Sequence, residues 1–88
     1  MLFAKVTNPN VGYDRDKEAV KTLSSTEIYI VDHISMGQSS SSVWLRMGDG
    51  VSRNPTAFNT VNFTFYKFGF DRYFVHNIFS DPYYNPYL

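Results

Sequence analysis

Apolar side chains recur at every second position in two segments of this sequence, 42–47 ("SVWLRM") and 59–67 ("NTVNFTFYK"). A period of two is the period of a β-strand with one buried face, because successive side chains point to opposite sides of a sheet. In the second segment the pattern predicts that Val61, Phe63 and Phe65 face inward. The sequence therefore favours an all-β fold.

Further strands are predicted from the residues around these segments. Residues 2–6 and 26–36 carry similar apolar patterns, and the slip in phase at Asp32 predicts a bulge or sharp bend. Residues 72–79 supply a last strand. Tight turns between short strands indicate an antiparallel five- to six-stranded sheet, curled into a small SH3-like barrel. At most one short helical turn is expected, capped by Asp16.

The chain of 88 residues is predicted to form one domain, residues 1–80, followed by an extended C-terminal arm, residues 81–88. A domain of this size buries only a modest share of its surface, and the sequence has no cysteine to cross-link it. Phe, Tyr and Trp make up 18% of the residues. Their large buried area, or assembly into a homo-oligomer, is expected to compensate.

Charge and hydropathy exclude several classes of partner. Eight basic and eight acidic residues cancel, which argues against a binder of long nucleic acid, because such a protein must neutralise several phosphates. No segment has the length and apolar character of a membrane span or of a signal peptide. We therefore expect a protein of the host cytosol with no membrane partner.

No pattern typical of an enzyme occurs. His33 follows Asp32 directly on a predicted strand, so the two side chains point to opposite faces and cannot act as a base and its orienting group. Neither His33 nor His76 has metal-ligand spacing. The serines of residues 39–42 have no base placed beside them. We predict a protein without catalytic activity, metal or cofactor.

The face opposite Val43 and Leu45 is the best candidate for a binding site. Trp44 and Arg46 suit a flat anionic ligand, since a ring can stack on a base while a guanidinium binds a phosphate. The turn at residues 37–42 adds N–H groups and hydroxyls. The predicted ligand-binding residues are Trp44, Arg46, Ser40, Ser42, Arg53, Asn59, Tyr66 and Arg72. The alternative is structural: Trp44 closes a second small core or packs under the C-terminal tail, and Arg46 lies across it.

The ending "SDPYYNPYL" combines aromatic residues with Pro82 and Pro86. Proline restricts its own backbone and that of the preceding residue, so the segment is expected to lose little entropy when it docks. The residues predicted to make arm or oligomer contacts are Tyr83, Tyr84, Tyr87 and Leu88. They contact either the same chain or a neighbouring one.

Three segments together resemble a known family: "GQSSSSVWL" (37–45), "FNTVNF" (58–63) and "SDPYYNPYL" (80–88). The family consists of small proteins from bacteriophages and mobile elements of Gram-positive bacteria. The resemblance covers residues 26–88 and departs from the family pattern at "SSTE" (24–27), where a Gly-Lys turn is expected. That family carries no established chemistry, so the resemblance implies a phage setting and no mechanism.

The functional hypothesis is a non-enzymatic phage protein of the counter-defence type, which sequesters a small nucleotide-derived immune signal. Stacking and charge-assisted contacts on one face fall short of the roughly 12 kcal/mol that nanomolar binding requires, which favours a site shared between subunits. Two alternatives stay open. The protein is an inhibitor of a host defence protein, or it is a component of the virion or of its assembly.

Overall fold

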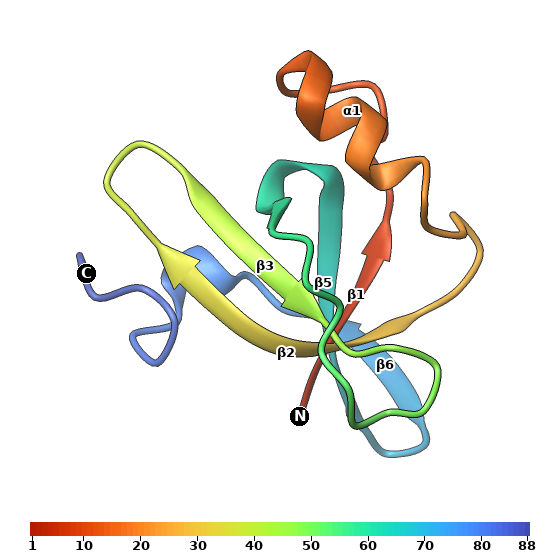
Figure 1. The fold of residues 1–88 in the computed structure, drawn as a ribbon. Coiled ribbons are helices and arrows are strands. Elements are labelled where there is room, and N and C mark those ends of the chain that lie inside the picture. Colours follow the sequence, from red (N-terminus) through yellow and green to blue (C-terminus); the bar gives the residue numbers. More distant parts are fainter.

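The computed structural model describes residues 1–88 and contains six strands, one short helix and two 3-10 turns (Figure 1). The strands are β1 (Leu2–Val6), β2 (Tyr29–Met36), β3 (Ser41–Leu45), β4 (Phe58–Asn59), β5 (Phe63–Gly69) and β6 (Arg72–Val75). The helix is α1 (Asp14–Val20), and the 3-10 turns are η1 (Thr60–Asn62) and η2 (Ile78–Ser80).

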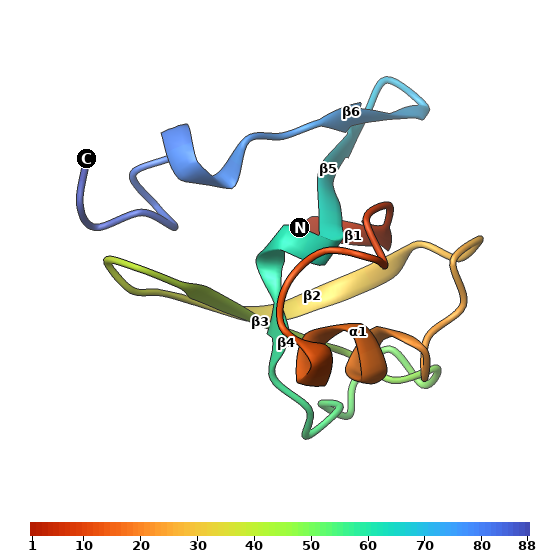
Figure 2. The same cartoon turned by 90° about the horizontal axis from the view of Figure 1, so that it is seen from above.

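All six strands form one antiparallel sheet in the order β4-β3-β2-β1-β5-β6. β2 has two parts: its first residues pair with β1, and its later residues pair with β3. The register between β2 and β3 shifts between Val31 and His33, which confirms the bend expected at Asp32. In Figure 2 the β2–β3 and β5–β6 hairpins extend in different directions from β1.

The predicted all-β class is confirmed, with α1 as the only α-helix. The 3-10 turn η1 stands between β4 and β5, and β5 returns to pair with β1. β4 and β6 form the two edges of the sheet and do not pair with each other, so the sheet is bent without being closed. The finer expectation of an SH3-like barrel stays a prediction.

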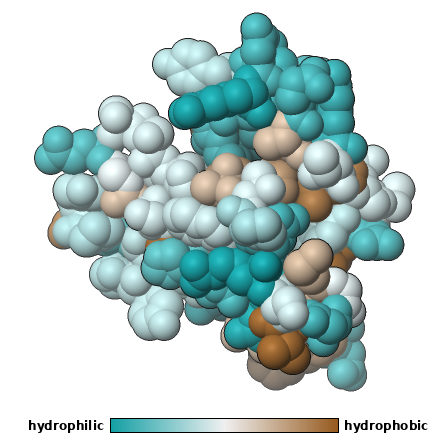
Figure 3. Space-filling model, viewed as in Figure 1, coloured by the Kyte–Doolittle hydropathy of each residue, from teal (hydrophilic) through white to brown (hydrophobic).

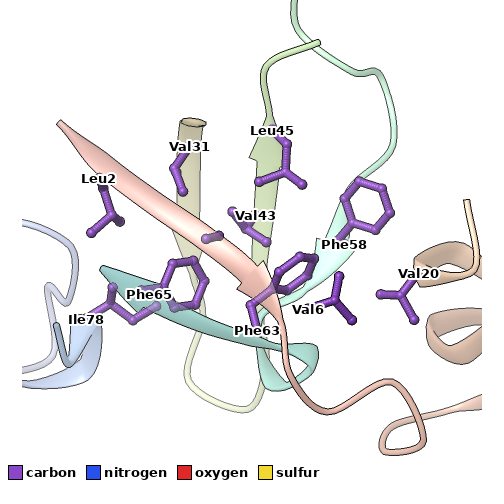
Figure 4. Close-up of a cluster of buried hydrophobic side chains, with 11 residues drawn as sticks. Leu2, Val6, Val20, Val31, Val43, Leu45, Phe58, Phe63, Phe65 and Ile78 are labelled. Carbon is purple, nitrogen blue, oxygen red and sulfur yellow. The ribbon is translucent and has the colours of Figure 1, made fainter. Parts of the chain in front are cut away.

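The hydrophobic core lies inside the bend of the sheet, where side chains from both halves meet (Figure 4). Alternate residues of β1 face it, as the period of two requires. Val43 and Leu45 of β3 and Phe63 and Phe65 of β5 are buried there as predicted. The whole cluster is Leu2, Ala4, Val6, Val20, Val31, Val43, Leu45, Phe58, Phe63, Phe65 and Ile78.

The strand predicted at residues 59–67 is interrupted, and two of its side chains face the opposite way from the prediction. Asn62 is fully buried, whereas Val61 is 47% exposed. The cause is the turn Thr60–Asn62, which begins where the Asn59 side chain accepts a hydrogen bond from the Val61 N–H at 3.2 Å. Regular alternation starts again only at Phe63.

The helix α1 begins three residues earlier than the sequence predicts. Asp16 was expected to be its N-cap, but Tyr13 holds that position and Asp16 lies within the first turn. The Asp16 carboxylate accepts a hydrogen bond from the Tyr13 N–H at 2.9 Å, so it still stabilises the helix start. Val20 at the other end of the helix packs into the core.

The C-terminal residues 81–88 form successive turns and not the extended arm that the prolines predicted. The Asp81 carboxylate accepts from the Tyr83 N–H, and the Asn85 side-chain carbonyl accepts from the Tyr87 N–H, each at 2.9 Å. Such short side-chain bonds favour turns over extended backbone. Tyr84 packs against the core, and burial raises the pKa of its hydroxyl.

Asn62 provides a test of how the turn after β4 is held. Its side-chain amide donates to the carbonyls of Asn8 at 2.8 Å and Val11 at 3.0 Å. Asn62→Ala would leave these acceptors unpaired, so we expect a loss of about 2 kcal/mol and a melting temperature lower by about 10 °C. Asn10→Ala, at an exposed position in the same loop, is the control and should change little. Equal melting temperatures for the two variants would contradict this account.

Candidate functional site

The structure separates the eight predicted ligand-binding residues into three places. Trp44, Arg46 and Arg53 lie together on the outer face of β3, near the bend of β2. Ser40, Ser42 and Asn59 gather at the β2–β3 turn and beside β4. Tyr66 and Arg72 belong to the β5–β6 hairpin. The bend in the sheet separates the third group from the other two, because it gives the two halves of the sheet different outer faces. The first two groups lie at opposite ends of β3.

Asp32 holds the two arginines of the first group. Its carboxylate accepts from Arg53 Nε at 2.6 Å and from Arg46 Nε at 3.4 Å. The bond from Arg53, aided by the charges of both guanidinium groups, lowers the pKa of Asp32. A ligand phosphate would have to compete with this carboxylate for both arginines.

Trp44 lies between two other side chains and is only partly exposed. The His33 ring packs beside it, with 5.5 Å between ring centroids, and the Arg53 guanidinium lies 5.9 Å from the indole centroid. An arginine therefore covers Trp44, as the structural alternative proposed, although it is Arg53 and not Arg46. Arg46 donates instead to the Gly50 carbonyl at 3.3 Å.

A groove of about 630 Å³ runs between the β2–β3 turn, the η1 turn and the C-terminal segment. Its volume is in the range of small-molecule sites. The rings of Tyr13, Phe79 and Tyr87 lie at this groove together with the polar groups of Ser40 and Asn59. The lining is completed by Met36, Gly37, Gln38, Ser39, Ser41, Thr60, Val61 and Asn85. Aromatic rings beside hydroxyl and amide groups suit a flat, polar ligand.

Short hydrogen bonds fix the two walls of the groove. In the β2–β3 turn, the Gly37 N–H donates to the Ser40 carbonyl at 2.8 Å. A Cβ atom at residue 37 would meet that carbonyl oxygen at 2.9 Å, so this turn requires glycine. On the opposite wall, the Asn85 side-chain amide donates to the Phe79 carbonyl at 2.7 Å. Both walls are therefore formed before any ligand binds.

A second hollow of about 360 Å³ shares Ser40, Ser41 and Asn59 with the groove and adds Arg15 of α1. Arg15 is the only cationic side chain at either hollow. Its side chain is 87% exposed, and its Nε lies 3.9 Å from the Asp16 carboxylate. Asn59 connects this wall to the helix, because its amide donates to Asp16 at 3.1 Å.

Sequence reasoning identified about half of this groove. The turn at residues 37–42, Asn59 and Tyr87 are among the predicted contact residues, but Tyr13 and Phe79 are not. Tyr13 lies in a segment without a period of two, where alternation carries no information. Phe79 was assigned to the last predicted strand, residues 72–79, but that strand ends at Val75 and Phe79 lies in the turn η2. The "NPNVGYD" and "NIFSDP" stretches are rich in turn-forming residues, which was the one available signal that such residues surround a hollow.

Two other features of the structure bear on the sequence-based expectations. No group of three His, Asp or Glu side chains is arranged so that it could hold a metal ion. None of the helices has both the length and the apolar character needed to cross a lipid bilayer.

The role of Asp32 can be tested through pH. Because its pKa is lowered in the folded chain, its stabilising effect is present above the unfolded value of 3.8 and is lost as the pH falls through the folded value. Asp32→Asn should therefore lower the melting temperature at pH 7, and the difference from the parent should disappear in strong acid. Asp71→Asn, at an exposed position, is the control. A difference that persists unchanged in acid would contradict the ion-pair account.

Comparison with known proteins gives one match. The family model described as bacteriophage T4 protein Y07B matches residues 1–88. No curated protein and no solved structure matches the chain.

Proposed function

The chain belongs to the family of bacteriophage T4 protein Y07B, and we propose that this phage protein acts by binding a small nucleotide-like molecule without transforming it. Membership of a phage family agrees with the setting that the sequence motifs implied. A Gram-positive host stays a prediction. The proposed role is counter-defence: the protein would sequester a nucleotide-derived signal of the host cell.

The observation that carries this proposal is the groove beside the β2–β3 turn. A base would stack on the rings of Phe79 and Tyr87, and the hydroxyl of Ser40 and the amide of Asn59 would bind its polar edge or a ribose. Stacking of this kind contributes about 1–3 kcal/mol per base. Arg15 in the adjoining hollow is placed to meet a phosphate. These contacts need no rearrangement of the walls.

The face around Trp44 supports the same ligand less well. Arg53 already covers the indole, and Asp32 neutralises one of the two positive charges. A phosphate there would displace an existing ion pair, which reduces the net free energy of binding. We therefore move the proposed site from Trp44 and Arg46 to the groove.

A protein partner is the second candidate function. The observation that favours it is the set of exposed aromatic side chains on the β5–β6 hairpin, Phe68, Phe70, Tyr73 and Phe74. An inhibitor of a defence protein, or a component of the virion, would use a surface of this type.

The groove is tested by two tyrosines of the same segment. Tyr87 lines the groove, whereas Tyr83 is 85% exposed and lies outside it. A thermal-shift screen with cyclic mononucleotides, cyclic dinucleotides, cyclic oligoadenylates and ADP-ribose should identify a ligand that raises the melting temperature. Calorimetric titration of that ligand should show at least a tenfold weaker affinity for Tyr87→Ala, because about 1.4 kcal/mol of stacking is lost. Tyr83→Ala should bind like the parent.

Two outcomes would contradict the proposal in different ways. If no compound in the panel stabilises the protein, the ligand class is wrong. If a compound binds and Arg46→Ala weakens it while Tyr87→Ala does not, the ligand lies on the Trp44 face and the groove is not the site.

A further inference from the structure

The β5–β6 hairpin carries five of the sixteen large hydrophobic side chains that are exposed in this fold. β6 is an edge strand that pairs only with β5, and all four of its residues are exposed. The exposed fractions on this hairpin are 54% for Phe68, 92% for Phe70, 44% for Tyr73, 46% for Phe74 and 74% for Val75. Figure 2 places this hairpin on the far side of the molecule from α1 and from the loop between β3 and β4. The hydrophobic surface at the lower right of Figure 3 therefore lies where that loop stands in front of the hairpin in the view of Figure 1.

The backbone of the hairpin determines which groups of β6 are free. Its two-residue turn has positive φ at Phe70 (52°) and Asp71 (62°), the conformation that matches the twist of paired strands. Gly69 faces Arg72 across this turn. Antiparallel bonding then alternates, so residues 72, 74 and 76 bond to β5, and the His76 N–H indeed donates to the Phe65 carbonyl at 2.8 Å. The N–H and C=O groups of Tyr73 and Val75 therefore point away from the sheet.

The two edges of the sheet differ in their protection. β4 has only two residues, it follows a proline-containing loop, and α1 lies against it through the bond from Asn59 to Asp16. On β6, residues 73–75 contain no charge, no proline and no bulge. Soluble proteins normally protect an edge strand by one of these devices, because a bare edge pairs with another chain.

We propose that a second copy of this chain pairs with β6, antiparallel and about a two-fold axis that passes beside Phe74. When a two-fold axis runs perpendicular to a sheet, the paired residues of the two copies direct their side chains to the same side of the sheet. Because side chains alternate along a strand, the numbers of two paired residues are then both odd or both even. With Phe74 on the axis, Tyr73 of each copy is opposite Val75 of the other. Because both residues direct their N–H and C=O groups outward, this register forms four backbone hydrogen bonds.

The side chains also fit this register. On the outer face, Tyr73 packs with Phe68 at 5.0 Å and with Phe3 at 5.3 Å between ring centroids, and Val75 is opposite Tyr66 on β5. Pairing would continue this aromatic layer across the axis, and it would bring the two Phe74 rings together on the other face. Aromatic cross-strand pairs of this kind stabilise antiparallel sheets.

Charge and area favour a second copy as the occupant. The chain has no net charge, so two copies do not repel each other. It exposes 5824 Å², whereas a folded monomer of 10.2 kDa typically exposes about 5,300 Å². At roughly 200 Å² for a whole aromatic side chain, the five exposed hairpin residues offer about 600 Å² per copy. Two copies would bury at most about 1,200 Å² if all of this surface were enclosed, the lower bound of a standard specific interface.

The test is sedimentation velocity over a dilution series of the full chain. The parent should change from dimer to monomer as it is diluted. Val75→Lys places a charge in the middle of the interface in both copies, and Val75→Pro removes an outward N–H without affecting a bond to β5. Each should raise the dissociation constant of the dimer at least tenfold. Val51→Lys is the matched control, because Val51 is also exposed, at 79%, but lies in the loop before β4.

Circular dichroism and melting temperature identify any variant that has lost its fold. If one of the two Val75 variants does not fold, the other one still tests the interface. A parent that is monomeric at every concentration would overturn the proposal. In that case, hairpin amide signals that shift on addition of a purified phage or host protein would assign the surface to a heterologous partner. A dimer that both Val75 variants leave unchanged would place the interface elsewhere and also overturn it. The result does not depend on the ligand proposed for the groove.

Discussion

The irregularity in β2 between Val31 and His33 is the feature on which the rest of the structure depends. It allows one strand to pair with β1 at its start and with β3 at its end, so the two halves of the sheet enclose a common core. It also leaves Asp32 without a directly opposed residue, and its carboxylate is there bonded to Arg46 and Arg53. A single extra residue thus creates both the fold and the ion-pair cluster on its outer side.

Where the strands end, amide and carboxylate side chains stabilise the turns through hydrogen bonds to the backbone. Asn59, Asn62, Asp81 and Asn85 each bond to backbone groups of turns that have no other regular partners. A chain with few buried residues cannot hold these segments by packing alone, because it has little core to offer them. The walls of the groove are made from these segments, so its shape follows from local hydrogen bonds more than from the sheet.

The strands were predictable from the sequence because alternation is a local property: Val43, Leu45, Phe63 and Phe65 are buried as the period of two requires. The burial of Asn62 was not predictable from alternation. A 3-10 turn of three residues changes which side chains face the core, and it has no sequence pattern of its own. The grouping of Trp44 with Tyr66 failed for a different reason. Two strands, β2 and β1, stand between Trp44 on β3 and Tyr66 on β5, and the bend at Asp32 turns the outer faces of the two halves away from each other. The position of β6 at the edge of the sheet could not be predicted either. "RYFV" has the composition of a buried strand, and only the strand order shows that one side of it is unpaired.

The positions of the groove and of β6 determine how the two proposals combine. The groove lies at the tip of the β2–β3 hairpin, and Figures 1 and 2 both show that tip on the opposite side of the molecule from the β5–β6 hairpin. A dimer paired through β6 would therefore carry its two grooves at its outer ends, each complete within one chain. The sequence favours a ligand site shared between subunits, whereas in the proposed dimer each chain would bind its own ligand. Binding at one groove would leave the other unchanged, since no residue of the groove belongs to the interface.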